Sequence, residues 1–244
     1  MQRVPEKNRR AKDGDDAAES AGRGARAPKP NPGGSRGPGA YPEAVERLVA
    51  EFARLPGIGK RTAERLAFHI LKASANEALP LAAAINDVKR NVRHCKTCYH
   101  LADGDVCGIC ADARRDRTCV MVVESPRDLI AVEQTGMYRG IYHVLMGRVS
   151  PLEGVRPEDL TISDLAERVR RPERNTGGEP IQEVIFAMNP TLEGDGTALY
   201  ITEALRTTGV RLSRLARGLP AGSQIEYANK SVLTDALQSR QGMP

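Results

Sequence analysis

The stretch CKTCYHLADGDVCGIC, residues 95–110, holds four of the five cysteines in this 244-residue chain. They form two pairs, Cys95-x-x-Cys98 and Cys107-x-x-Cys110, with eight residues between the pairs. Such spacing is typical of one closed zinc site in which thiolates fill all four tetrahedral positions. The intervening YHLADGDV is too short and polar to form the strand and helix that frame a redox-active CxxC motif. The sequence therefore predicts a structural Zn²⁺ ion in a zinc finger over residues 94–111.

The segment before the cysteines, residues 41–93, has helical periodicity interrupted by LPGIG at residues 55–59, and a further helix is expected from about Leu79 to Val92. A proline before a Gly-x-Gly turn between two short helices is typical of a helix-hairpin-helix. Its glycines let a phosphate approach the backbone, and the free N–H groups of the second helix attract anions. The residues expected to bind DNA phosphates are Gly57, Gly59, Lys60, Arg61 and Arg65. An ordinary helical turn with solvated cations is the alternative, and either way no base sequence would be read.

Beyond the cysteines, strand and helix patterns alternate. The run CVMVVE, residues 119–124, is apolar and β-branched, as in a strand buried on both faces. Further strands are expected at residues 141–145, 183–188 and 210–215, and helices at residues 127–134, 163–169 and 197–206. The order predicts a small parallel α/β sheet domain over residues 118–214.

Acidic residues follow two of these strands. Glu124 closes the first, and Glu193 and Asp195 fall in the loop MNPTLEGDG after the third. Because ligands bind beyond the carboxyl ends of parallel strands, the three carboxylates could converge on one Mg²⁺ ion, as in a Toprim domain. In the alternative, Asp195 caps the next helix and Glu193 is solvated. An Mg²⁺-dependent strand-cleaving enzyme stays open, although Tyr138 and Tyr142 are expected to pack within the sheet domain.

Charge and composition set the first forty residues apart. They hold nine Lys/Arg against five Asp/Glu, and twelve of them are Gly or Pro, so we expect a disordered basic tail over residues 1–40. The remainder is nearly neutral, with 27 Lys/Arg against 26 Asp/Glu, and any DNA affinity there requires a local patch. No apolar run approaches the ~20 residues of a membrane span, which favours a soluble cytoplasmic protein without membrane contact.

The complete array resembles the RecR family of bacterial recombination mediators over about residues 41–235. The motifs that carry the resemblance are the cysteine pairs, LPGIGKRTAERLAFHIL, VVESPRDLIAVEQTGMYRGIYHVLMGRVSPLEG, NPTLEGDGTALYI and LARGLPAGSQIEYAN. It implies an α/β multidomain protein without catalytic activity, built from a helix-hairpin-helix, a four-cysteine zinc module and a Toprim domain. It also implies a ring-shaped homotetramer, in which residues 215–244 form a C-terminal oligomerisation segment.

The resemblance further implies partners and residue roles. The family acts with RecO, and often RecF, to load RecA on single-stranded DNA at gaps, and binds single-stranded, duplex and gapped DNA near the nucleoid. By position, Arg61 and Arg65 match its DNA-contacting residues, the four cysteines match its zinc ligands, and the three acids match Toprim positions associated with partner binding. Two positions depart from the pattern. The turn continues as Lys60-Arg61 where Pro-Lys is common, and Asn229 stands where Asp is usual.

Overall fold

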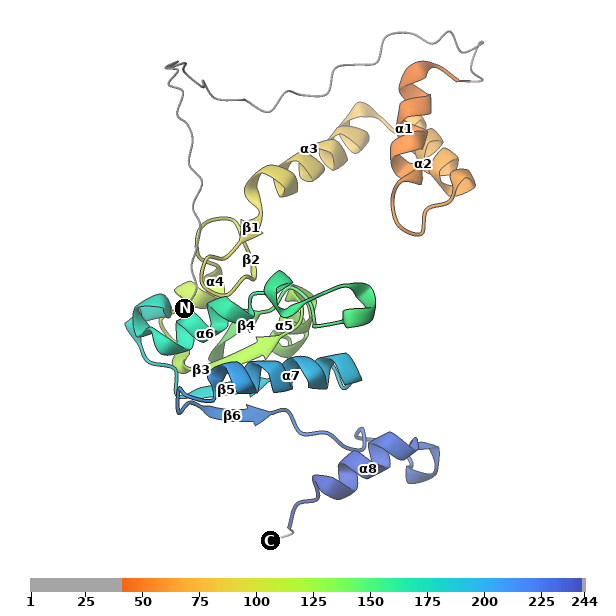
Figure 1. The fold of residues 1–244 in the computed structure, drawn as a ribbon. Coiled ribbons are helices and arrows are strands. Elements are labelled where there is room, and N and C mark those ends of the chain that lie inside the picture. The colour runs from red at the N-terminus through yellow and green to blue at the C-terminus, as the bar shows by residue number, and fades with distance from the viewer. Residues whose placement is uncertain (1–40, 243–244) are drawn as a thin grey trace, which may run out of the picture. The chain divides into compact units, whose positions relative to one another are not determined.

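The computed structural model describes residues 41–242, which form two compact units divided between Lys72 and Ala73 (Figure 1). The basic tail expected over residues 1–40 lies outside the described residues. In the part that is described, no helix is long and apolar enough to cross a membrane.

The first unit is a helical hairpin. It consists of α1 (Glu43–Ala53) and α2 (Lys60–Lys72), joined by the LPGIG turn. Ala63 and Ala67 of α2 are fully buried, because their small side chains let the two helices pack closely. The ring of Phe68 meets that of Tyr41 edge-on, with centroids 5.3 Å apart. The helix-hairpin-helix predicted from the sequence is therefore present.

The second unit begins with α3 (Ala75–Asn91), which starts four residues before the expected Leu79. The cause is a helix cap: the Glu77 carboxylate accepts the Ser74 N–H at 3.0 Å, and Pro80 is accommodated inside the helix. The cysteine segment follows as a short antiparallel pair, β1 (Arg93–His94) and β2 (Leu101–Ala102), and a one-turn helix, α4 (Gly108–Ala111).

A parallel four-stranded sheet forms the centre of this unit, in the order β4-β3-β5-β6. All four strands predicted from the sequence are present, and the α/β fold class is confirmed. The strands are β3 (Asp116–Val123), β4 (Gly140–Val144), β5 (Glu183–Phe186) and β6 (Arg211–Arg214). The helices around them are α5 (Pro126–Glu133), α6 (Ile162–Arg170) and α7 (Leu192–Leu205).

Alternating residues of β3 build a separate core on each face of the sheet. Val120 and Val122 pack with residues of α6 and α7, including Leu165 and Ile201. Met121 and Val123 face the opposite way, toward α5 and the partly buried Ile109 and Tyr99 of the cysteine segment. The continuous apolar run of β3 follows from this double burial.

Short 3₁₀ turns and a final helix complete the described residues. The 3₁₀ turns are η1 (Pro151–Glu153), η2 (Pro157–Asp159), η3 (Pro172–Arg174), η4 (Thr176–Gly178) and η5 (Ile225–Tyr227). The last helix, α8 (Lys230–Gln238), begins after Asn229, whose side-chain oxygen accepts the Val232 N–H at 2.9 Å. Asn229 is therefore a helix cap, a role that Asn and Asp fill about equally well.

Candidate functional sites

The four cysteine sulfurs converge on one point. Their Sγ atoms all lie within 4.8 Å of one another, each residue is at most 3% exposed, and the Sγ atoms of Cys98 and Cys107 are 3.5 Å apart. A Zn²⁺ ion with four sulfurs at about 2.3 Å holds neighbouring sulfurs about 3.8 Å apart, so these cysteines fit a tetrahedral zinc site. In residues 41–242, no other group of three or more His, Cys, Asp or Glu side chains converges in this way.

Backbone hydrogen bonds shape the first cysteine knuckle and join it to the sheet. Tyr99, in the left-handed region at φ 63°, donates its N–H to the Cys95 oxygen at 2.9 Å, and Cys95 donates to the His100 oxygen at 2.7 Å. The Val144 N–H at the end of β4 donates to the Cys98 oxygen at 2.8 Å. The zinc module is thus bonded to the sheet domain through a ligand residue.

The LPGIG turn leaves the N-terminus of α2 open, as the predicted phosphate site requires. Gly57 has φ 77°, a conformation that favours glycine, and the space on the Cβ side is open at both Gly57 and Gly59. The Ala63 N–H donates to the Gly59 oxygen at 2.9 Å, and within residues 41–242 the N–H groups of residues 60–62 have no acceptor. The side chains of Lys60, Arg61 and Arg65 are exposed and form no ion pair with any other described residue.

The first acid, Glu124, is buried where β3 and β5 end side by side. Asn189 holds both of its carboxylate oxygens, donating its N–H to Oε1 at 2.7 Å and its Nδ2 to Oε2 at 2.9 Å. Gly194 completes this packing, because a Cβ there would lie 2.2 Å from the Asn189 oxygen. This position is the switch point of the sheet, where the chain crosses from one side of β3 to the other.

The other two acids lie in a helix and not in the expected loop. Thr191 caps α7 by accepting the Gly194 N–H at 3.1 Å, so Glu193 and Asp195 fall in its first turn, where the helix dipole favours acids. The three acids therefore do not form a group of converging carboxylates. The capping role considered for Asp195 belongs to Thr191.

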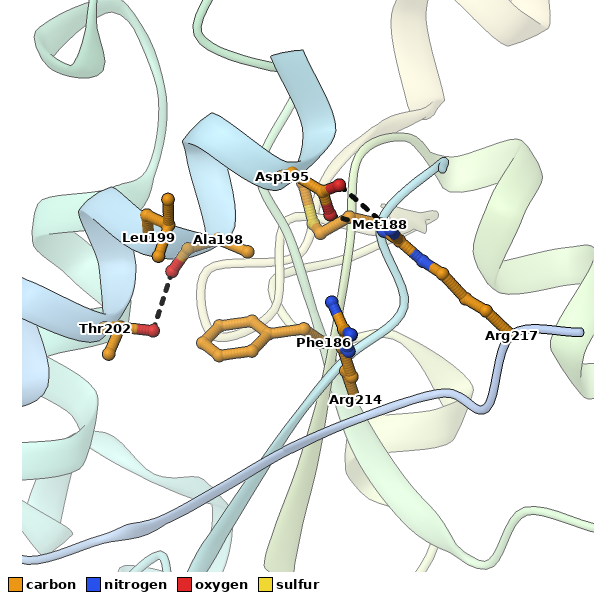
Figure 2. A pocket seen from close by; sticks show the side chains of 8 residues that line it. All are labelled: Phe186, Met188, Asp195, Ala198, Leu199, Thr202, Arg214 and Arg217. Atoms are coloured by element: carbon orange, nitrogen blue, oxygen red, sulfur yellow. Dashed lines mark hydrogen bonds and ion pairs between the residues drawn. The ribbon is translucent and has the colours of Figure 1, made fainter. Parts of the chain in front are cut away.

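Asp195 is paired with Arg217, which comes from the segment after β6 (Figure 2). The guanidinium binds both carboxylate oxygens, with Nη1 2.9 Å from Oδ2, and this pairing lowers the pKa of Asp195. The pair borders a pocket of about 270 Å³ between α7 and β6, where Phe186, Met188 and Leu199 supply apolar walls and Arg214 a second cation. Figure 2 shows the two charged groups turned toward each other at its edge.

Tyr138 and Tyr142 pack in the sheet domain, as the sequence analysis expects. The Tyr142 hydroxyl donates to Glu133 Oε1 at 2.6 Å, and the Tyr138 hydroxyl donates to the Cys119 oxygen at 3.0 Å. Burial raises the pKa of both phenols, which opposes formation of a phenolate nucleophile.

The sequence analysis missed three residues that organise these sites. Asn189 and Arg217 hold the acids, and Arg168 of α6 reaches the zinc module. Asn189 carries a partial signal, since it stands at the carboxyl end of a predicted strand. Arg168 follows Leu165 by three residues and so lies near the apolar face of its helix, whereas nothing local in the sequence marks Arg217.

Comparison with known proteins gives three family matches in chain order. They are the helix-hairpin-helix of RecR at residues 45–89, the four-cysteine zinc finger domain of RecR at residues 92–112 and the Toprim domain at residues 118–216. The chain is 50% identical over 198 residues to Recombination protein RecR of Rhodopirellula baltica, covering 81% of this chain and 96% of that protein. It is 48% identical over 200 residues to Recombination protein RecR of Rubrobacter xylanophilus, covering 82% and 97%. The zinc finger match and the converging sulfurs together establish structural zinc.

Proposed function

Since the chain belongs to the RecR family, we propose that it is a DNA-binding recombination mediator in DNA repair with no catalytic activity of its own. It acts with RecO and RecF to load RecA on single-stranded DNA at gaps, as a homotetrameric ring in the cytoplasm at the nucleoid. Support comes from about half-identity over nearly the whole length of proteins named Recombination protein RecR.

The observation that carries the DNA-binding part of the proposal is the α2 start. About two helical turns at this start contain three features. They are three backbone N–H groups without acceptors in the described residues, a glycine with open space beside it, and three exposed cations. A phosphate fits such a place, because N–H groups, helix dipole and side-chain charge attract it together. The same phosphate occurs in single-stranded, duplex and gapped DNA, so binding is independent of sequence.

The contacts of the acids support a protein that binds DNA without cutting it. Asn189 holds both oxygens of Glu124, and a Mg²⁺ ion at Asp195 would compete with the guanidinium of Arg217 for the same carboxylate. Arg217 already supplies the positive charge next to Asp195. The acidic edge is thereby suited to hold the C-terminal segment in place, where partner proteins can bind it.

An Mg²⁺-dependent strand-cleaving enzyme is the second candidate, and the Toprim match at residues 118–216 favours it. Such an enzyme needs acids free to bind metal and a nucleophile or activated water near Glu124. Of the tyrosines considered above, Tyr142 is buried and Tyr138 is partly buried, and the hydroxyls of both are hydrogen-bonded. The mediator therefore accounts for more of the observed contacts.

Charge reversal at the α2 start tests the proposal. Arg61→Glu with Arg65→Glu should lower DNA affinity to a similar extent on all sequences and reduce the slope of log K against log salt by about one per lost phosphate contact. Fluorescence anisotropy of labelled DNA over a salt series measures both quantities.

The matched control uses Arg47→Glu with Lys72→Glu. These exposed cations belong to the same two helices but lie away from the turn in sequence, and the net charge changes equally. Equal loss of affinity in both double variants would mean that only overall charge matters, and an unchanged affinity in the Arg61/Arg65 variant would remove the hairpin from DNA binding.

A further inference from the structure

Arg168 is a buried cation at the junction between the zinc module and the sheet domain. It lies on α6 and is 2% exposed, and among residues 41–242 no other Lys or Arg is buried. Transferring a charge from water to the protein interior is costly unless an opposite charge compensates it. The buried guanidinium of Arg168 is therefore expected to have a negatively charged group near it.

All of the hydrogen-bond acceptors around Arg168 are neutral. Its Nε and Nη2 donate to Asn175 Oδ1 at 3.1 and 3.0 Å, and its Nη1 donates to the Tyr142 oxygen at 2.7 Å. A longer bond of 3.4 Å joins Nη1 to the oxygen of Thr97. None of the ion pairs within the described residues involves Arg168, so no carboxylate there neutralises it.

The orientation of the guanidinium is fixed by a second layer of contacts. Asn175 is itself buried, and its Nδ2 donates to the Arg117 oxygen at 2.8 Å and to the Glu179 oxygen at 2.7 Å. With the amide held this way, Asn175 Oδ1 faces Arg168, and Nη1 is directed to the cysteine knuckle. Thr97, which it reaches there, lies between the ligands Cys95 and Cys98.

The group next to Arg168 that can carry negative charge is the cysteine cluster, because Thr97, which its Nη1 reaches, lies between Cys95 and Cys98. Burial of the guanidinium lowers the pKa of Arg168, and the nearby Cys110, Cys98 and Cys95 oppose this shift. Four thiolates around one Zn²⁺ carry a net charge of about −2, which persists in the interior only if cations or N–H donors balance it. The buried cation without an acid partner thus lies next to the residues that form the anionic metal centre.

We propose that Arg168 is the internal counter-cation of the zinc–thiolate centre and couples metal binding by the knuckles to α6 of the sheet domain. It touches no ligand sulfur, so it is a positioning residue that acts through charge and through the Thr97 carbonyl. The Val144 N–H on Cys98 provides a second, uncharged link at the same junction.

Zinc affinity of the full chain tests this proposal. Arg168→Met should bind Zn²⁺ about 10- to 100-fold more weakly, as measured by competition with a chromogenic chelator, because outer contacts of metal sites have effects of this size. Arg168→Lys should recover most of the loss, because it keeps the charge. Arg170→Met should bind like the parent, since Arg170 lies on the same helix but is exposed.

Cobalt spectra separate a charge effect from lost packing. In the Co²⁺-loaded protein, removing a nearby cation should shift the thiolate-to-metal charge-transfer bands to longer wavelength in Arg168→Met, and Arg168→Lys should restore them. Unchanged metal affinity and unchanged bands, with only stability reduced, would overturn the proposal. Should Arg168→Met fail to fold, Arg168→Gln replaces it, and equal zinc affinity in the Gln and Lys variants would contradict a role for charge.

Discussion

Gly57 and Gly59 belong to one turn but are glycines for different physical reasons. Gly57 has φ 77°, where any other L-residue is strained by about 1–2 kcal/mol, so its identity follows from the backbone. Gly59 has no such constraint, and no atom of the described fold lies within 4 Å of its missing Cβ. The open space at Gly59 is what an approaching phosphate would need.

We therefore expect Gly59→Ala to fold normally and to bind DNA roughly tenfold more weakly, which corresponds to about 1.4 kcal/mol. Gly57→Ala should instead lose about 1–2 kcal/mol of folding stability. Urea melts give the stability of both variants, and anisotropy gives their DNA affinity. Parental DNA affinity in a folded Gly59→Ala protein would argue that the backbone at this turn does not contact phosphate.

Residues with local sequence signals could be predicted, whereas residues that act through distant contacts could not. The zinc ligands were predictable because their spacing is local, whereas the DNA-binding role of the cations after the LPGIG turn stays a prediction. The partner of Asp195 was not, since Arg217 is 22 residues away and meets it only after β6 has joined the sheet. The burial of Arg168 was also not predictable from the sequence, because a charged residue in an amphipathic helix normally faces water.

Among the elements, α7 differs most from its prediction. The sequence LEGDG reads as a loop, since glycine and aspartate both favour turns. The Thr191 cap overrides those preferences and starts the helix at Leu192, five residues before the expected start. The strands were predictable, because burial on both faces selects continuous β-branched runs such as CVMVV.

Thr197 joins α7 to the loop after β4. Its hydroxyl donates to the Glu193 oxygen at 2.6 Å and accepts the Val149 N–H at 2.9 Å, and the residue is fully buried. Thr197→Val keeps the shape but leaves the Val149 N–H without its acceptor, which should reduce the free energy of unfolding by about 1–3 kcal/mol.

Urea unfolding of Thr197→Val tests this link, with Thr202→Val as the matched control. Thr202 lies on the same helix and its hydroxyl also donates one turn back, to the Ala198 oxygen at 2.8 Å, but it is exposed. The control should lie within about 0.5 kcal/mol of the parent. Similar unfolding midpoints for the two variants would show that the Val149 contact adds no stability.

At the scale of the whole molecule, the order of modules was readable from the sequence, and their internal joints were not. The helix-hairpin-helix, zinc module and Toprim domain follow one another as the motifs predict. The joints are hydrogen bonds between distant residues, such as Val144 to Cys98 and Asn189 to Glu124. They show how one sheet is bonded to the cysteine module and how two of its acids are held by other residues of the same chain.

The proposed function requires the protein to bind DNA without cutting it. The most direct test mixes it with an end-labelled gapped duplex in Mg²⁺ and follows anisotropy over time, with a denaturing gel of the same samples and Glu124→Gln alongside. The account predicts a rise to a stable plateau that salt reverses, intact strands, and similar binding by the Glu124→Gln protein. Anisotropy that decays below the value of free DNA, with cut strands that Glu124→Gln abolishes, would contradict it and identify the acidic edge as a catalytic centre.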